Sequence, residues 1–165
     1  MSGNKGAVSI RLDYYDTSFC FITAHLAAGH ENIDERNADY RTIVNGLHFL
    51  RGKTIDSHEY VSQPLVSHER SPQKQRCSNI IWLADVNYRI DLDNASVRVY
   101  AEDDALDMLL AADQLNYVMN AGAAFSGYIE GPILFRPTYR YDLGTDNYDT
   151  SEKMRIPAWT GRSLN

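Results

Sequence analysis

The sequence contains few cysteines, no excess of positive charge and no long apolar run. Its 165 residues include two cysteines, Cys20 and Cys77, a number that offers no disulfide framework and suits a reducing compartment. Acidic residues outnumber basic ones by 22 to 16, and the resulting formal charge of −6 disfavours broad electrostatic binding to nucleic acid, although it leaves room for a local basic pocket. No stretch approaches the length of a membrane span, and residues 1–6 lack the apolar core of a secretory signal. We therefore expect a cytoplasmic chain that is long enough for one domain with its own core.

Two apolar, strand-like runs end in polar side chains. Residues 18–26 and 80–86 are expected to be strands, and side chains two positions apart in a strand share a face. One face therefore carries Phe19, Phe21, Thr23 and His25, and one face of the second run carries Ile81, Leu83, Asp85 and Asn87. Each of these faces changes from apolar to polar along its strand. This pattern delivers His25, Asp85 and Asn87 to the rim of a sheet, where active sites are commonly built.

A second strand is expected beside the first run. Residues 4–13 are expected to pair with 18–26 as a hairpin whose turn lies at 14–17, which would place Asn4 nearly opposite His25. Such a hairpin argues against a purely parallel sheet. Together with the interleaving of strands and helices along the chain, it indicates an α/β or α+β fold.

The remaining segments are assigned by periodicity and composition. Helices are expected at 31–50 and 101–115, where apolar residues recur at helical spacing. Residues 62–79 contain two prolines and show no periodicity, so they are expected to be a disordered loop. Loops are also expected at 120–132 and 144–153, and extended segments at 133–142 and 155–159.

Asp85 and Asn87 form an Asp-x-Asn pair whose chemistry suits phosphoryl transfer. A carboxylate can hold a divalent cation or orient a water, and a neutral amide can bind a phosphate oxygen without like-charge repulsion. The alternative is a strand-to-turn junction, where Asp and Asn are common. His25 also has two interpretations: it assists a phosphate or positions Asp85, or it is a structural histidine hydrogen-bonded to the backbone.

Cations and a phenol gather around a polar loop late in the sequence. Tyr139, Arg140, Lys153 and Arg155 flank residues 144–152, and Lys153 and Arg155 would share one side if that stretch were extended. Guanidinium, ammonium and phenol groups all suit a phosphate ligand. The alternative is a solvated loop whose cations balance the acidic residues nearby.

Six segments, in this order, carry recognisable motifs: Gly3–Val8, Thr23–Ala28, Arg36–Tyr40, Trp82–Arg89, Pro137–Asp142 and Tyr148–Trp159. Together they resemble the signatures of inositol polyphosphate 5-phosphatase catalytic domains, and the synaptojanin-like type is the most similar. The resemblance covers nearly the whole chain apart from 62–79. It implies that residues 1–165 are a partial catalytic domain in which 62–79 is a disordered insertion.

This resemblance implies a DNase I-like α/β (α+β) fold, in which two packed β-sheets form a sandwich flanked by helices. It also implies Mg²⁺-dependent hydrolysis of the 5-phosphate of phosphatidylinositol 4,5-bisphosphate or related inositol phosphates. The partner is then a phosphoinositide head group or a soluble inositol phosphate, so the protein would meet membranes peripherally, through its substrate alone, and would not bind nucleic acid.

The resemblance also assigns roles to individual residues. By position, Asp85 resembles the residue that orients the attacking water, and Asn87 and His25 resemble those that bind the scissile phosphate. The residues that resemble contacts to the neighbouring 4-phosphate are Tyr139, Arg140, Lys153 and Arg155. Asn4 and Lys5 match a motif that lines the pocket.

The sequence departs from the family pattern at several points. The resemblance implies a metal-binding Glu upstream of Gly3, a Ser-Asp-His motif beyond Asn165, and an Asp where this chain has Gly161. We therefore expect a truncated domain with an incomplete fold, no assignable metal ligand, and weak or no activity in the isolated chain. Two alternatives remain, a non-catalytic module that binds inositol phosphates and a DNase I-like nuclease.

Overall fold

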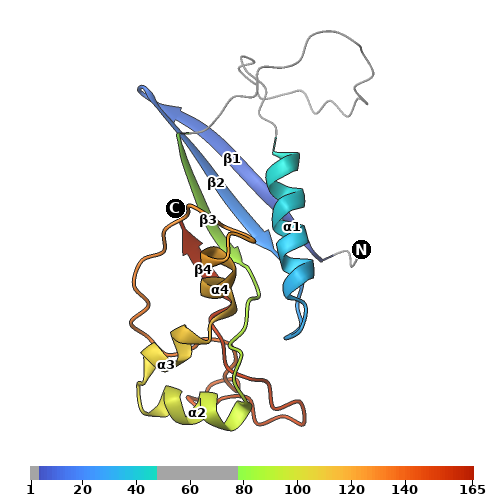
Figure 1. Ribbon diagram of the computed structural model, residues 1–165, viewed down its shortest axis with the longest axis vertical. Coiled ribbons are helices and arrows are strands. Elements are labelled where there is room, and N and C mark those ends of the chain that lie inside the picture. Colours follow the sequence, from blue (N-terminus) through green and yellow to red (C-terminus); the bar gives the residue numbers. More distant parts are fainter. Residues whose placement is uncertain (1–3, 48–77) are drawn as a thin grey trace.

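The computed structural model describes residues 4–47 and 78–165. Along the chain they form β1 (Gly6–Tyr14), β2 (Thr17–His25), α1 (Ile33–Gly46), β3 (Asn79–Asp85), α2 (Asn94–Glu102), α3 (Leu106–Ala111), α4 (Gln114–Asn120) and β4 (Gly161–Leu164), as Figure 1 shows. Every helix in this described part is too short or too polar to span a lipid bilayer. The predicted disordered loop at 62–79 lies, as far as residue 77, outside the described residues.

The four strands form one mixed sheet in the order β1-β2-β3-β4. The β1–β2 hairpin is antiparallel, as predicted, while β2 and β3 are parallel and β3 and β4 are antiparallel. In this register Gly6 pairs with His25, His25 with Asp85, and Asp85 with Gly161. These four residues therefore form a single row across one end of the sheet. The predicted register is off by two residues, because Gly6 rather than Asn4 lies opposite His25.

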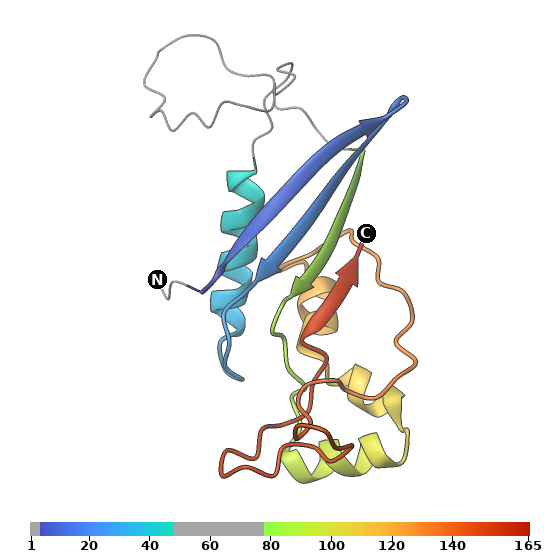
Figure 2. The same ribbon diagram turned by 180° about the vertical axis from the view of Figure 1, so that it is seen from behind.

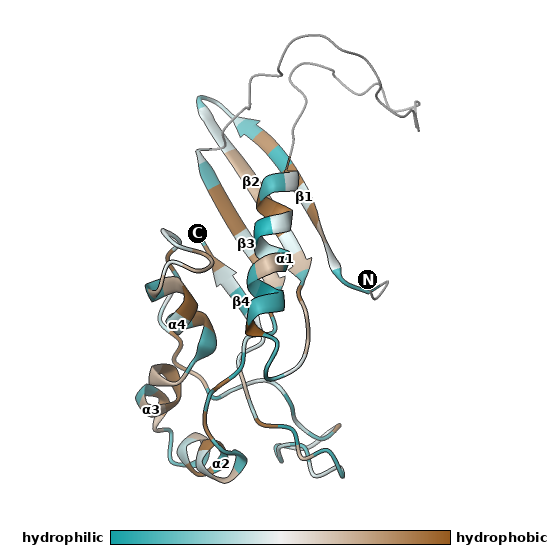
Figure 3. Cartoon of the chain, turned by 45° about the vertical axis from the view of Figure 1, so that its right-hand side comes forward, coloured by the Kyte–Doolittle hydropathy of each residue, from teal (hydrophilic) through white to brown (hydrophobic). Residues whose placement is uncertain are grey.

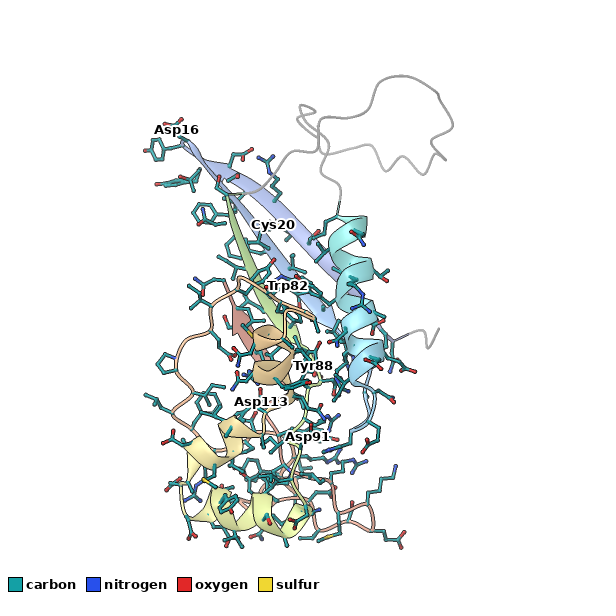
Figure 4. All side chains as sticks on the ribbon, in the orientation of Figure 1. Asp16, Cys20, Trp82, Tyr88, Asp91 and Asp113 are labelled. Atoms are coloured by element: carbon teal, nitrogen blue, oxygen red, sulfur yellow. The ribbon has the colours of Figure 1, made fainter. Side chains whose placement is uncertain are left out.

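One face of the sheet holds the main hydrophobic core. Alternate residues of β2 and β3 are buried on it, among them Ile22 and Trp82, because side chains in a strand alternate between its two faces. Helices α1 and α4 cover this face, contributing Tyr40 and Leu115. Figures 1 and 2 show both helices on the same side of the sheet, and Figure 4 shows Cys20, Trp82 and Tyr88 following one another down it.

The opposite face of the sheet is apolar but exposed. Val8 and Ile10 of β1 and Leu83 of β3 are 66%, 65% and 54% exposed. No helix of the described residues crosses this face in Figure 2, and Figure 3 shows the apolar segments along the strands. Of the two sheets expected for a sandwich, the described residues form one.

A smaller core lies beyond the row that ends the sheet, between α2, α3 and the returning chain around Trp159. The predicted single helix at 101–115 is wrong, because three helices occupy 94–120. The carboxylate of Asp113 accepts a hydrogen bond from the backbone N–H of Asn116 and so begins α4, and Asp104 adopts a left-handed φ of 54° between α2 and α3. Local side-chain capping and a left-handed residue both interrupt a helix that apolar spacing alone would continue.

The predicted extended segment at 133–142 is not a strand. It makes isolated bridges only, Tyr139 with Ala158 and Tyr141 with Tyr148. Its carbonyl groups accept hydrogen bonds from side chains instead, as when the Trp159 indole donates to the Phe135 carbonyl at 3.0 Å. The strand expected at 155–159 starts later, at Gly161.

Candidate active site

Lys5, His25 and Asp85 meet at the row that ends the sheet. His25 Nε2 lies 2.5 Å from Lys5 Nζ and 3.6 Å from Asp85 Oδ2. The parallel β2 and β3 end together, which brings two residues 60 positions apart in the sequence to adjacent places. Both side chains of the His25–Asp85 pair are 44% exposed, so they are open to a ligand. The sequence-based expectation that His25 and Asp85 share a rim is confirmed.

The direction of the hydrogen bond between Lys5 and His25 follows from the groups that make it. An ammonium group donates hydrogen bonds only, so Lys5 donates to His25 Nε2, and this leaves the ring proton on Nδ1. Asp85 Oδ1 is buried and has no hydrogen-bond partner among the described residues. One oxygen of this carboxylate therefore lacks a hydrogen-bond donor within the described residues.

Asn4 lies next to this trio but just outside the sheet. It lines a shallow hollow of about 390 Å³ together with Lys5 and His25. Asn4 and Lys5 thus lie at the sheet end predicted for them, whereas the place directly opposite His25 belongs to Gly6.

Asn87 lies beyond the end of β3, so strand alternation does not determine where its side chain lies. β3 ends at Asp85, and Asn87 has a left-handed φ of 57°, so the prediction that it continues the Asp85 face is wrong. Asn tolerates this backbone region better than most residues. The Asn87 side chain is buried, its Nδ2 donates to the Leu26 carbonyl at 3.1 Å, and its backbone N–H donates to the Thr160 carbonyl at 3.2 Å. These bonds tie Asn87 to the residue that follows His25.

Arg89 holds the other end of the Asn87 side chain. Its Nη2 donates to Asn87 Oδ1 at 2.8 Å, and its Nε donates to the Asn87 carbonyl at 3.0 Å. The guanidinium carbon lies 4.5 Å from the centre of the Tyr139 ring. Arg89 belongs to one of the quoted motifs, but nothing in the sequence alone signals this contact.

Helix α1 fixes the loop that follows His25. Asp39 Oδ2 accepts the Ala27 N–H at 2.9 Å, and Arg36 Nη1 donates to the carbonyls of Ala27 and Gly29 at 3.3 and 2.6 Å. Arg36 is fully buried, and burial lowers its pKa to about 10, which leaves it charged at neutral pH. Its Nη2 donates to Gln114 Oε1 at 2.7 Å. The motif around Arg36 and Asp39 therefore serves as the frame for the site's loops.

The four residues predicted to contact a neighbouring phosphate separate into two pairs. Tyr139 and Arg140 line an open cleft of about 680 Å³ that also includes Thr160, whose carbonyl accepts the Asn87 N–H. Lys153 and Arg155 are not among the residues that line this cleft. The first pair therefore adjoins the Asn87 end of the site and the second does not.

Arg155 is engaged by an acid, and the stretch around it is not extended. Arg155 Nη1 lies 3.0 Å from Asp149 Oδ2, and the Ser151 hydroxyl and the Arg155 backbone N–H hold the pKa of the Asp149 carboxyl well below its usual range. Met154 has a left-handed φ of 40°. The expectation that Lys153 and Arg155 lie on one side of an extended segment is therefore wrong.

The described residues supply only part of a metal site. Within 4–47 and 78–165, no three or more His, Cys, Asp or Glu side chains cluster closely enough to hold a metal ion. The unpartnered Asp85 Oδ1 is one oxygen ligand of the kind that Mg²⁺ and Ca²⁺ prefer. Mg²⁺ often binds one or two carboxylates and completes its shell with water and substrate phosphate, so Asp85 fits a cation that is shared with a phosphate group.

Comparison with known families and proteins identifies relatives of this chain. The model of the family described as Endonuclease/Exonuclease/phosphatase family 2 matches residues 1–165. Inositol-1,4,5-trisphosphate 5-phosphatase 1 of Schizosaccharomyces pombe is 49% identical over 164 residues, which cover 99% of this chain and 14% of that protein. Human synaptojanin-1 is 44% identical over 163 residues, which cover 99% of this chain and 9% of that protein. The chain thus spans a small part of each of these curated relatives.

Solved structures also match this chain. The crystal structure of the inositol polyphosphate 5-phosphatase domain of SPsynaptojanin, in complex with inositol (1,4)-bisphosphate and a calcium ion, matches with a TM-score of 0.79 and 48% identity. The match covers 98% of this chain and 43% of that one. A Cimex nitrophorin matches with a TM-score of 0.65 at 21% identity, which is evidence for the fold alone.

Proposed function

Because this chain belongs to endonuclease/exonuclease/phosphatase family 2, and its relatives include inositol polyphosphate 5-phosphatases, we propose that its site binds phosphorylated inositol and serves the hydrolysis of the 5-phosphate. The substrate class is phosphatidylinositol 4,5-bisphosphate or a related inositol phosphate. The trio of Lys5, His25 and Asp85 carries the proposal, and Asn87 is tied beside it through the Leu26 carbonyl. Lys5 supplies a cation, Asp85 a hydrogen-bond acceptor and Asn87 an amide donor at the same end of the sheet.

Each of these groups has a part in phosphate ester hydrolysis. Water attacks phosphorus and loses a proton, the bond from phosphorus to the inositol oxygen breaks, and the inositol oxygen takes up a proton, so that inorganic phosphate and an inositol hydroxyl are formed. Asp85, with an acceptor oxygen unpartnered, orients the water. Lys5 and the remaining N–H of Asn87 donate to the phosphate oxygens, and His25, whose Nε2 accepts from Lys5, orients the Lys5 ammonium group.

The cleft beside Thr160 is the proposed place of a second phosphate. Tyr139 and Arg140 line it and offer a phenol and a guanidinium, which suit a phosphate on the neighbouring ring carbon. Lys153 and Arg155 retain a proposed part in the same subsite on the resemblance alone.

We propose Mg²⁺ as the cofactor, and Asp85 would be one of the residues that hold it. The calcium ion in the related crystal structure and the free oxygen of Asp85 support a divalent cation there. When bound, such a cation neutralises charge on the phosphate oxygens. Because the described residues provide no group of three or more potential ligands, we propose that the 165-residue chain by itself binds its ligand and turns it over weakly or not at all.

We also propose that the protein is cytoplasmic and meets membranes peripherally, through a phosphoinositide head group. The formal charge of −6 supports inositol phosphate over nucleic acid as ligand, since a nucleic-acid backbone favours a basic surface. A nuclease of the same fold is the alternative, and nicking of plasmid DNA by the purified chain would favour it.

Isothermal titration calorimetry of the chain with inositol 1,4,5-trisphosphate tests the binding proposal. We expect the wild type to bind and Lys5→Ala to weaken binding by about tenfold, because a charge-assisted hydrogen bond to phosphate is lost. Arg136→Ala is the matched control, since it also removes one positive charge but from an exposed pair with Asp104; it should leave affinity unchanged. Absence of binding by the wild type, or equal weakening by both variants, would refute the proposal.

Phosphate release from phosphatidylinositol 4,5-bisphosphate in the presence of Mg²⁺ tests the expected weakness of turnover. Rapid release that Asp85→Ala abolishes would overturn the expectation of weak activity while supporting the reaction class.

A further inference from the structure

Arg89 contacts the Asn87 side chain without lining the cleft. We propose that Arg89 is a positioning residue that fixes the orientation of the Asn87 amide, so that an N–H rather than the carbonyl oxygen is presented toward bound phosphate. This inference rests on the proposed function. It adds a role for a residue that is outside the trio of Lys5, His25 and Asp85 and outside the set predicted to bind substrate.

Both ends of the Asn87 side-chain amide have a hydrogen-bond partner. Asn87 Oδ1 accepts from Arg89 Nη2 at 2.8 Å, and Nδ2 donates one of its two hydrogens to the Leu26 carbonyl at 3.1 Å. A flipped amide would set its NH₂ against the guanidinium and its oxygen against the Leu26 carbonyl, two contacts between like groups. Arg89 and Leu26 therefore select one orientation, which leaves one N–H of Asn87 as a donor.

The orientation matters because phosphate oxygens only accept hydrogen bonds from such a group. An amide oxygen turned toward them would repel them, whereas an aligned N–H stabilises charge without reorganising when the ligand arrives. Asn87 is buried, so water cannot readily rescue a wrong orientation. The orientation of the Asn87 amide therefore determines whether this side chain attracts or repels the bound phosphate.

Arg89 is itself held firmly enough to do this. Its backbone N–H donates to Gln114 Oε1 at 2.9 Å, and its carbonyl accepts the Gln114 backbone N–H at 2.8 Å. The Tyr139 ring lies 4.5 Å from its guanidinium, and Arg89 is buried. Lysine has neither the planar fork that reaches both acceptors of Asn87 nor the same stacking surface.

The same stacking links the two proposed parts of the site. Tyr139 lines the cleft offered to the second phosphate, and Arg89 lies between its ring and the Asn87 amide. Arg89 thereby sets the phosphate donor and one wall of the cleft relative to each other.

A double-mutant cycle with the full 165-residue chain separates positioning from general structural support. The readout is affinity for inositol 1,4,5-trisphosphate, and the variants are Arg89→Lys, Asn87→Gly and both together. Glycine accepts the left-handed backbone of position 87 and removes the amide. We expect Arg89→Lys to weaken binding by about tenfold, the worth of one hydrogen bond to a charged group, and to have less than about a twofold effect when Asn87→Gly is already present.

Equal effects of Arg89→Lys in both backgrounds would overturn the proposal, because Arg89 would then act independently of Asn87. Arg136→Lys, which alters an exposed arginine that also donates to one carboxylate through two nitrogens, is the control and should change nothing. If Arg89→Lys does not fold, Asn87→Asp tests the other end of the contact. It keeps an acceptor for the guanidinium but has no N–H, so unchanged affinity would contradict the assigned orientation.

A second measurement needs no ligand and therefore remains informative if the proposed function fails. In the ligand-free chain, the side-chain NH₂ protons of Asn87 should give two separate, slowly exchanging NMR signals. We expect Arg89→Lys to merge or broaden this pair while other Asn side chains keep theirs. An unaltered pair in a folded variant would refute the positioning role, whereas loss of the pair together with no inositol phosphate binding by the wild type would refute the proposed function alone.

Discussion

Gln114→Met is expected to destabilise the folded chain by about 2–6 kcal/mol. Gln114 is 1% exposed, and all of its side-chain hydrogen-bonding positions are used. Its Oε1 accepts from Arg36 Nη2 at 2.7 Å and from the Arg89 N–H at 2.9 Å, while its Nε2 donates to Asp91 Oδ1 at 2.6 Å and to the His30 carbonyl at 3.2 Å. The side chain therefore joins α1, the loop after β2, the segment after β3 and α4.

The magnitude follows from which partners are left unsatisfied. Methionine has nearly the length and volume of glutamine, so the substitution leaves no large cavity and the loss is chiefly polar. The buried Arg89 N–H loses the acceptor it has here, and Arg36 Nη2 keeps only the His30 carbonyl at 3.2 Å. Each such group costs about 1–3 kcal/mol. Asp91 is half exposed, so water replaces Gln114 there at little cost.

Equilibrium unfolding in urea, followed by tryptophan fluorescence, measures this loss. Tyr117→Gln is the matched control, because Tyr117 lies on the same helix, is 70% exposed and should shift stability by no more than about 0.5 kcal/mol. A loss below about 1 kcal/mol for Gln114→Met would refute the reasoning, since it would mean that these buried groups do not depend on Gln114. The variant should also weaken inositol phosphate binding, because Arg89 would lose one of its supports.

Three further outcomes are expected. Arg162→Met should cost about 3–5 kcal/mol in the same urea assay, because it leaves the fully buried Asp113, now 3.0 Å from Arg162 Nη1, as an unpaired charge; a loss similar to that of a surface substitution would contradict this. Gly161→Ala should raise stability by about 0.4–1 kcal/mol, because an added Cβ meets nothing within 4 Å and the unfolded chain becomes less flexible; destabilisation would show that the space is not available. The Ser151 hydroxyl is the largest of the influences that lower the pKa of Asp149, so the stabilisation from this carboxylate is fully present above about pH 4, its unfolded pKa, and is lost as the pH falls toward the lower folded value. An NMR titration in which the Asp149 carboxyl titrates near pH 4 would contradict that sign.

The sequence predicts the rim well because β-strand alternation and parallel pairing are simple rules. His25 and Asp85 each follow a run of alternating apolar residues, and parallel β2 and β3 bring such ends to the same edge. The hairpin register is harder, since a two-residue shift of the kind found at Gly6 and Asn4 keeps every side chain on the same face. Asn87 shows a different limit, because its left-handed backbone ends the alternation on which its placement was based.

The remaining differences between prediction and structure arise where polar side chains form hydrogen bonds that apolar periodicity does not reveal. Asp93 and Asp113 accept backbone N–H groups at the starts of α2 and α4. Helix α2 therefore starts where apolar spacing indicates no helix, and α4 starts where apolar spacing indicates that a helix continues. The network around Gln114 leaves no pattern in the sequence, since its partners lie 23 to 84 positions away. Contacts of that kind depend on tertiary packing, which periodicity does not encode.

The site combines exposed and buried polar groups, and this difference bears on how it meets a ligand. His25 and Asp85 are each 44% exposed, so they are hydrated until a phosphate displaces that water. Asn87 is 4% exposed and already bonded at both ends of its amide, so its remaining donor needs no reorganisation when a phosphate arrives. The buried network of Arg36, Gln114 and Arg89 therefore stabilises the fold and fixes one donor in advance, and damage to any member of that network should reduce both stability and affinity.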